Sequence, residues 1–333
     1  MEIENRSVDV IIPTYKRASF LDRAIDSVLA QTYRFVNVIV VDDNNQNDEY
    51  RLETEKLMLK YSSNSRVTYL KHERNMNGAA ARNTGIRYSS ADFIAFLDDD
   101  DFYLSTKIEL QIKELCTKDE TWGGCACFHV RRYKKYAYKK FSINENFLGD
   151  YCYDFLSGKT STPSSTLLIK SEVFRSIGLF DETFRRHQDL EFLVRFYQKY
   201  KMAVSPHYAV FMQTEGFRNY PKSEIAYEIK NKFLEKYKNE IQRYTLKQQR
   251  EIYKSQWFEV AVLFLRDRDL VNARRLFSNY IFVKGERSYV DYFRVLFFLI
   301  VGYFPNFRKL ISILFGLTVY RRFSGNIDGR ILV

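Results

Sequence analysis

The chain has few residues that interrupt regular structure. Of its 333 residues only 5 are proline and 13 are glycine, and no low-complexity linker divides it. This composition argues against a chain of domains joined by low-complexity linkers. The length and a hydrophobic content of 46% fit one large domain, or a domain with an appendage.

Cysteine is also scarce. Cys116, Cys125, Cys127 and Cys152 show no CxxC spacing. Neither a zinc site nor a disulfide framework is therefore expected, and the spacing favours reduced, buried thiols in a cytosolic protein.

Long apolar runs and a targeting segment are missing as well. The start of the chain, Met1 to Arg6, is mostly polar and has no apolar h-region, so no signal peptide is expected. The apolar runs at residues 295–304 and 310–320 are each shorter than the ~20 residues that span a bilayer, and Arg308 and Lys309 interrupt them. They favour helices that lie in a membrane surface, with a buried bundle or an oligomer contact as the alternatives.

The net charge of +11 is concentrated near the C-terminus. Residues 215–333 hold 22 Lys and Arg against 12 Asp and Glu, a surplus of ten, so the remainder is almost neutral. We therefore predict two regions, a domain at 1–215 and a basic helical region at 216–333. The second region is expected to meet an anionic surface, where each basic residue near anionic lipid contributes ~1 kcal/mol.

Strand and helix patterns alternate in the first hundred residues. Strands are expected at residues 8–12, 36–41, 67–70 and 93–97, and helices at 20–29, 49–61 and from 77 onward. Ser19 is the expected N-cap of the first helix. The alternation predicts an α/β fold with a mostly parallel sheet and helices on both faces. Neither GxGxxG nor GxxxxGK[ST] occurs, which argues against a Rossmann dinucleotide site and a P-loop.

Four consecutive acids, Asp98 to Asp101, follow the buried strand at 93–97, and we call them the acidic tetrad. Neighbouring carboxylates repel one another, so the tetrad is expected to need a counter-charge. Mn²⁺ and Mg²⁺ prefer oxygen ligands, and ligands of α/β sheets bind beyond the carboxyl ends of the strands. The tetrad therefore predicts a metal-diphosphate site, with a solvated acidic turn as the alternative.

The order of four motifs resembles the family 2 glycosyltransferases of the GT-A fold. The motifs are Pro13-Thr14-Tyr15, Val41-Asp42-Asp43, Gly78-x-x-x-Arg82-Asn83 and Leu97 with the tetrad, and the resemblance extends from about Val8 to about Tyr200. It implies a nucleotide-sugar donor, Mn²⁺ or Mg²⁺ on a DxD motif, and an inverting displacement. By position in DxD, Asp100 would bind the metal and Asp98 would face the ribose.

Side chains that suit a uridine nucleotide lie in these motifs. Asp43 can accept the N3–H of uracil, Thr14 offers a hydroxyl and Tyr15 an aromatic face. Arg82 offers a planar cation to the phosphates. The alternatives are an Asx-turn or a helix cap for Asp42 and Asp43, and a salt bridge to the tetrad for Arg82. The other candidate donor residues are Pro13, Arg17 and Asp99.

The candidate catalytic base lies about ninety residues after the tetrad. On a helix, Asp189 shares a face with Phe192 and Leu193, where an acid is costly without a task or partner. The family resemblance places the base at the first acid of this motif, which is Asp189. An N-terminal helix acid stabilised by the dipole is the alternative. Asp101, Ser164 and His187 are candidate acceptor contacts.

Together these features predict an enzyme that transfers a hexose from a UDP-sugar to a polyprenyl-diphosphate-linked glycan in O-antigen or capsule (lipopolysaccharide-type) synthesis. It would be cytoplasmic and peripheral on the inner face of the inner membrane, and its C-terminal helices leave oligomerisation open. One alternative is a nucleotide-sugar-binding protein without turnover. Another is a nucleic-acid binder, suggested by the basic-aromatic run at 131–140 but unsupported by any recognition module.

Overall fold

The computed structural model describes residues 5–133, 138–142, 151–159, 162–213 and 221–281. The chain divides into two compact units, Met1–Asn219 and Tyr220–Val333. The predicted boundary between residues 215 and 216 and the apolar runs at 295–304 and 310–320 lie outside the described residues.

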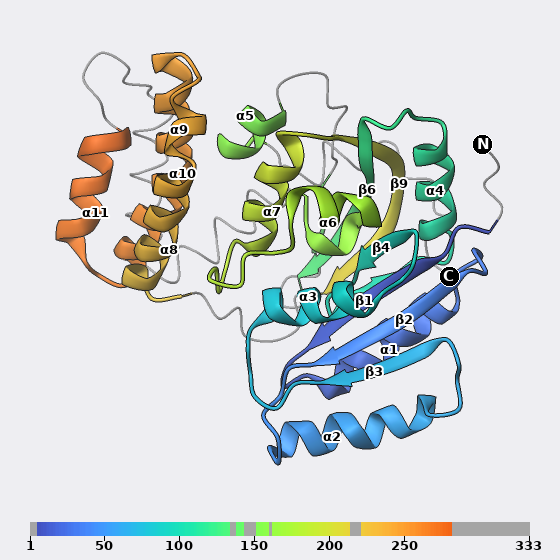
Figure 1. The fold of residues 1–333 in the computed structure, drawn as a ribbon. Helices are drawn as coiled ribbons and strands as arrows, with labels where there is room; N and C mark the ends of the chain where they lie inside the picture. The colour runs from blue at the N-terminus through green and yellow to red at the C-terminus, as the bar shows by residue number, and fades with distance from the viewer. Residues whose placement is uncertain (1–4, 134–137, 143–150, 160–161, 214–220, 282–333) are drawn as a thin grey trace. The chain divides into compact units, whose positions relative to one another are not determined.

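A nine-stranded sheet forms the centre of the first unit (Figure 1). Its strand order is β3-β2-β1-β4-β8-β6-β9-β5, and β7 pairs with β6. The strands are β1 (Val8–Thr14), β2 (Val36–Asp42), β3 (Val67–Lys71), β4 (Phe93–Phe96), β5 (Phe102–Tyr103), β6 (Trp122–Tyr133), β7 (Tyr138–Ser142), β8 (Leu167–Lys170) and β9 (Lys201–Gln213).

The first four strands confirm the predicted parallel arrangement. β1 pairs in parallel with both β2 and β4, and β2 pairs in parallel with β3. The other half of the sheet is mixed, since β8 runs antiparallel to β4 and to β6 while β6 and β9 are parallel. Apolar strand patterns do not encode direction, so only the alternation with helices made the parallel half predictable.

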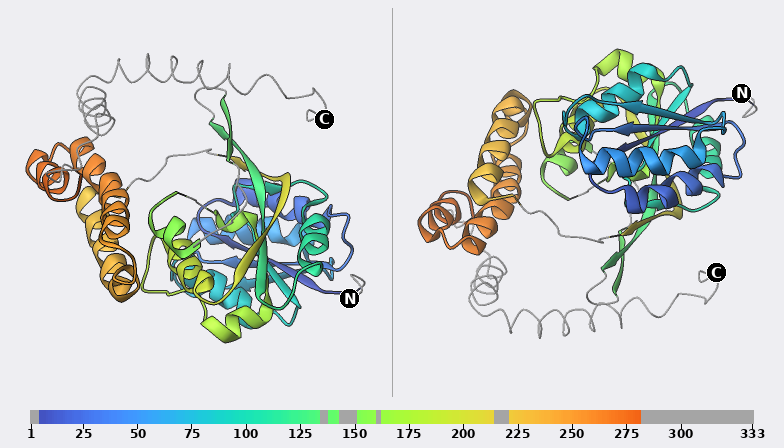
Figure 2. Two further views of the ribbon diagram at one scale, coloured as in Figure 1. Left: turned by 90° about the horizontal axis from the view of Figure 1, so that it is seen from above. Right: turned by 90° about the horizontal axis from the view of Figure 1, so that it is seen from below.

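Helices cover both faces of the parallel half. β1 is buried on both sides: Val8, Val10 and Ile12 belong to the core cluster that includes the buried side chains of α1 (Ala18–Leu29). Ile11 points the other way, against α3 (Gly78–Tyr88), where a Cβ on Gly85 would come within 2.6 Å of it. α2 (Glu49–Met58) contacts α1, and the right-hand view of Figure 2 shows both over the sheet.

This layering follows from the handedness of the crossovers. The chain moves outward from β1 to β2 to β3 and then returns past β1 to β4. Right-handed connections therefore put α1 and α2 on one face and α3 on the other. The order in which strands are added to the sheet reverses between β1 and β4, since β2 and β3 lie on one side of β1 and β4 lies on the other. At such a point the carboxyl ends of the two neighbouring strands open a crevice in which α/β proteins bind ligands.

The first helix begins earlier than predicted. α1 starts at Ala18, with Arg17 at the N-cap position and no side-chain cap, so the prediction of Ser19 as N-cap is wrong. Lys16 has a φ of +60°, which turns the chain sharply within the short connection between β1 and α1. Ser19 is therefore already helical.

The remaining helices of the first unit follow the tetrad. They are α4 (Lys107–Cys116), α5 (Tyr151–Leu156), the 3₁₀ turn η2 (Ser164–Thr166), α6 (Ser171–Ile177) and α7 (Gln188–Tyr197). α7 is anchored by aromatic packing, since the ring of Phe192 stacks on Phe174 of α6 and on Phe180. This packing fixes the N-terminus of α7, which carries the candidate base.

The second unit is helical as far as it is described. Its helices are α8 (Ser223–Lys236), α9 (Lys238–Ile241), α10 (Leu246–Arg266) and α11 (Leu270–Leu276), followed by the short π-helix η3 (Phe277–Ile281). Thr245 and Gln248 form a capping box at the start of α10. Among the described residues, no helix has both the length and the apolar character needed to cross a bilayer.

Candidate active site

The candidate site lies at the carboxyl ends of β1 and β4. Thr14 ends β1, and its hydroxyl donates a 2.8 Å hydrogen bond to Asp99 in the loop after β4. Pro13 is the register partner of Val41 in β2, and Tyr15 is exposed just beyond the strand. The predicted donor residues of β1 and the acidic tetrad therefore meet across the crevice.

The acidic tetrad already has counter-charges from the chain. Arg17 places Nε 3.2 Å from Asp99 and Nη1 2.6 Å from Asp100. Arg82 lies 2.7 Å from Asp98, and Arg23 donates to the backbone carbonyl of Asp100 at 2.8 Å. The counter-charge that the tetrad was expected to need is therefore supplied, in this structure, by arginines from α3, α1 and the turn before α1.

The four carboxylates have different environments. Asp99 and Asp101 are buried, and burial raises the pKa of Asp99 to about 7 and that of Asp101 well above its usual range. Asp101 accepts from the Ser165 hydroxyl at 2.8 Å and from the backbone N–H of Gln213. Its carboxylate is turned into the protein, so the predicted acceptor contact at Asp101 is not available in this structure.

Asp98 and Asp100 are the more open pair, with side chains 40% and 19% exposed. Burial raises the pKa of Asp100, and the positive charge of Arg17 opposes this rise. No group of three His, Cys, Asp or Glu side chains among the described residues is arranged around a metal position. One or two carboxylates with phosphate oxygens are, however, a usual donor set for Mg²⁺, so the partly exposed Asp100 fits the metal that the tetrad predicts, and the more exposed Asp98 is open to the ribose.

Arg82 contacts several residues of the candidate site through four hydrogen bonds of its guanidinium. Its Nη1 donates to Gln188 at 3.1 Å and to the carbonyl of Gly78, while its Nη2 contacts Asp98 and, at 3.3 Å, the hydroxyl of Ser164. The salt bridge weighed as an alternative for Arg82 is therefore present. The Arg82 side chain, which belongs to α3, thereby also connects the tetrad, η2 and α7.

Asp189 lies in the first turn of α7, next to Gln188. Burial raises its pKa; the Arg82 charge opposes the rise and the Asp98 charge adds to it. The tetrad and the candidate base thus act on each other electrostatically, as a shared site requires. His187, at the N-cap position of α7, has a φ of +60°.

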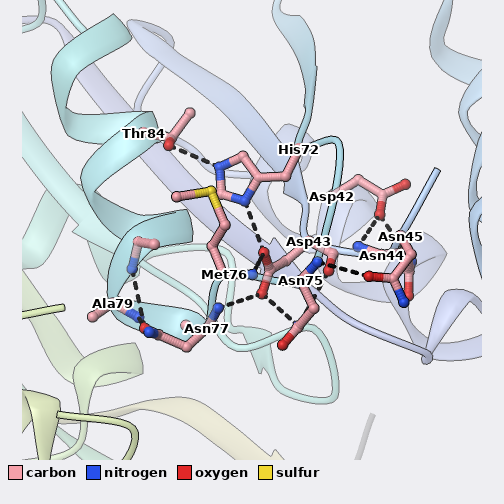
Figure 3. Close-up of polar contacts among 12 residues, drawn as sticks. Asp42, Asp43, Asn44, Asn45, His72, Asn75, Met76, Asn77, Ala79 and Thr84 are labelled. Carbon is pink, nitrogen blue, oxygen red and sulfur yellow. Dashed lines mark hydrogen bonds and ion pairs between the residues drawn. The ribbon is translucent and has the colours of Figure 1, made fainter. Parts of the chain in front are cut away.

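Asp43 has a different environment from the predicted one (Figure 3). Its carboxylate accepts from the backbone N–H groups of Met76 and Asn77, from Asn75 Nδ2 at 2.8 Å and from the ring of His72 at 2.7 Å. These four bonds occupy both oxygens, so the open acceptor for uracil is not found. The side chain instead builds the loop that leads into α3.

The neighbouring Asp42 forms the Asx-turn that was weighed as an alternative. It accepts from the backbone N–H of Asn44 at 2.9 Å and pairs with the buried Arg51, whose Nε is 2.9 Å away. Arg51 also donates to the carbonyls of Asn44 and His72. The ends of β2 and β3 are thereby tied together beside the crevice.

Sequence reasoning missed Gln188 and His72. Gln188 directly precedes the candidate base, but nothing in its spacing showed that it contacts Arg82. His72 follows β3, and its ring connects Asp43 to the hydroxyl of Thr84 on α3. The rule that polar residues at strand ends gather in one place would have identified His72.

Residues 9–177, about half of the chain, match the sequence family described as "Glycosyl transferase family 2". The chain belongs to glycosyl transferase family 2. Family membership and the α/β sheet identify the fold as GT-A.

Three relatives and one solved structure illustrate the similarity. An uncharacterized glycosyltransferase, RP339, from Rickettsia prowazekii is 32% identical over 203 residues, covering 57% of this chain and 58% of that protein. The chain thus spans little more than half the length of that relative. The UDP-Glc:alpha-D-GlcNAc-diphosphoundecaprenol beta-1,3-glucosyltransferase WfgD of Escherichia coli is 38% identical over 105 residues, covering 32% and 39% of the two chains.

The similarity to the amylovoran biosynthesis glycosyltransferase AmsB of Erwinia amylovora is lower but longer, at 24% identity over 87% of this chain and 95% of that protein. The structure of S. aureus TarS 1–349 in complex with UDP-GlcNAc aligns with a TM-score of 0.49 at 16% identity, over 81% of this chain and 88% of that one.

Proposed function

We propose that this protein is an inverting, metal-dependent glycosyltransferase that moves a hexose from a UDP-sugar to a hydroxyl of a lipid-diphosphate-linked glycan. The observation that carries the proposal is the position of Arg82, which contacts Asp98 of the tetrad and Gln188 beside Asp189. A donor site and a proton acceptor within one crevice are the two parts that glycosyl transfer needs.

The donor would lie over the ends of β1 and β4. Tyr15 offers its exposed ring to the base, and Pro13 and Thr14 form the adjoining edge. Arg17 and Arg82 are cations within reach of a diphosphate. Asp100 would hold Mn²⁺ or Mg²⁺, which when bound supplies charge neutralisation for the leaving UDP, and Asp98 would face the ribose.

Asp189 would accept the proton of the acceptor hydroxyl. A general base is most effective when its pKa is moved toward the working pH, and burial raises the pKa of Asp189 in that direction. Attack from the face opposite the leaving UDP turns an α-linked donor into a β-glycoside. Ser164 and His187 remain the candidate acceptor contacts.

The acceptor class rests on the relatives and on the C-terminal region. WfgD is named for a diphosphoundecaprenol-linked acceptor and AmsB for amylovoran synthesis, so we propose a surface-polysaccharide substrate. We propose further that the catalytic region covers residues 1–215. The basic region at residues 216–333 would hold the enzyme on the cytoplasmic face of the inner membrane or form an oligomer contact.

The test is a panel of UDP-sugars offered with a synthetic lipid-diphosphate-GlcNAc acceptor and Mn²⁺. We expect one UDP-hexose to yield UDP and a β-linked disaccharide, and EDTA to stop the reaction. UDP-sugar binding without any product would favour the non-catalytic alternative. Salt-sensitive RNA or DNA binding that is indifferent to Mn²⁺ would favour the nucleic-acid alternative.

A further inference from the structure

The guanidinium of Arg17 pairs with the carboxylates of the acidic tetrad where a metal ion was expected. One guanidinium reaches two carboxylates, with Nε 3.2 Å from Asp99 and Nη1 2.6 Å from Asp100. The sequence led us to expect a metal to neutralise these acids, yet in this structure a side chain performs that task. A metal that uses Asp100 must therefore displace or share this contact.

The anchoring of Arg17 differs from that of the other two arginines. Its side chain is 45% exposed, against 12% for Arg82, which makes four hydrogen bonds. Arg23 is fixed by its bond to the Asp100 carbonyl and by the ring of Phe102, 5.2 Å away. Arg17 is thus the member of this group that can leave the tetrad without breaking the packing.

The backbone near Arg17 would stay in place during such a movement. Only Tyr15, Lys16 and Arg17 connect β1 to α1, and Arg17 forms the N-cap position of that helix. A rotation of the side chain alone would carry the guanidinium from Asp100 toward the crevice above Thr14. A planar guanidinium binds two phosphate oxygens as readily as two carboxylate oxygens.

We infer that Arg17 is an exchangeable counter-ion, which neutralises the tetrad in the free enzyme, competes with the divalent cation for Asp100, and moves to the donor diphosphate when the metal binds. The inference rests on the proposed function. It makes metal and nucleotide binding mutually supportive, because the metal releases the cation that the diphosphate needs.

The test measures binding rather than turnover. Arg17→Gln removes the competing charge, while Arg87→Gln removes an arginine of the exposed Arg87–Glu182 ion pair and serves as the matched control. Titration of the free protein with Mn²⁺, followed by electron paramagnetic resonance, gives the metal affinity without nucleotide. Calorimetry with UDP at saturating Mn²⁺ gives the nucleotide affinity.

We expect two effects of opposite sign in Arg17→Gln. Mn²⁺ alone should bind about fivefold more tightly, because a strong exposed ion pair contributes about 1 kcal/mol and its loss removes the competition for Asp100. UDP should bind at least about fivefold more weakly. The Arg87→Gln control should change neither. Arg17→Lys, which keeps the charge but loses the two-pronged contact, should lie between wild type and Arg17→Gln for both ligands.

Other outcomes separate the two proposals. Unchanged or weaker Mn²⁺ binding in Arg17→Gln would overturn the competition, and unchanged UDP binding would overturn the transfer to the diphosphate. A general structural role for Arg17 would weaken both affinities and lower the melting temperature. If the wild-type protein binds neither Mn²⁺ nor UDP, the proposed function itself fails.

Discussion

Arg82 donates a 2.7 Å hydrogen bond to Asp98, 16 residues further along the chain. The same guanidinium reaches Gln188 on α7, so one side chain from α3 joins the acidic tetrad to the segment that carries Asp189. Its partly buried charge also opposes the rise in the pKa of Asp189. The contacts of Arg82 thus connect the proposed donor side of the crevice to the proposed acceptor side.

Asp189→Asn tests the catalytic base. The amide cannot accept the proton of the acceptor hydroxyl, so kcat should fall by about 10²- to 10⁴-fold. The Kd for UDP should stay close to wild type, since Asp189 has no assigned contact with the nucleotide. Asp26→Asn, at the exposed ion pair of Asp26 with Lys60, is the matched control and should retain full activity. A wild-type rate in Asp189→Asn would remove Asp189 from the mechanism.

The pH dependence of kcat/KM follows from the same residue. Asp189 must be deprotonated to act, and burial raises its pKa above the ~3.9 of an ordinary aspartate. Activity should therefore fall on acidification at a higher pH than an exposed aspartate would give. Arg82→Gln removes the opposing positive charge and leaves that of Asp98, so the acid limb should move to still higher pH. A limb that moves down, or stays fixed, would contradict this assignment.

The parallel half of the fold could be predicted because its signals are local. Apolar runs ending in polar residues marked β1, β2 and β4, and the helical pattern between them implied crossovers. The direction of β8 and the pairing of β6 with β9 could not be predicted in this way, since both depend on contacts between segments far apart in the chain.

The site residues follow the same division. Thr14, Asp98 and Asp100 follow from their places at strand ends, and Arg82 from its place in the first turns of α3. The structural role of Asp43 could not be predicted from its position at the end of β2, because two of its four hydrogen-bond partners are backbone amides 33 and 34 residues further along the chain. Likewise, the pairing of Arg17 with the tetrad depends on a side-chain direction that no periodicity encodes.

The burial of Lys107 leads us to expect that the protein becomes more stable as the pH rises above about 8. Its ammonium is fully buried, 4.0 Å from the centre of the Tyr103 ring, and burial lowers its pKa to about 8. Between pH 8 and ~10.4 the unfolded chain binds this proton and the folded chain does not, so stability should rise with pH by about 3 kcal/mol across that range.

The comparison for this prediction is Lys107→Met, which fills a similar volume without a titrating group. Urea unfolding at several pH values should show the rise in wild type and not in the variant. Equal pH profiles for the two proteins would show that Lys107 keeps its proton when folded.

Asp43→Asn distinguishes a loop-building residue from a nucleobase acceptor. The amide has one acceptor oxygen and a donating NH₂ group, so it cannot accept all of the bonds from His72, Asn75, Met76 and Asn77. Leaving such buried donors unpaired costs about 1 to 3 kcal/mol each, so the free energy of unfolding should fall even without ligand. Urea unfolding of the nucleotide-free protein measures it. An unchanged stability combined with a large loss of UDP affinity would instead restore Asp43 as the contact to uracil, and would mean that the loop from Asn75 to Asn77 opens when the nucleotide binds.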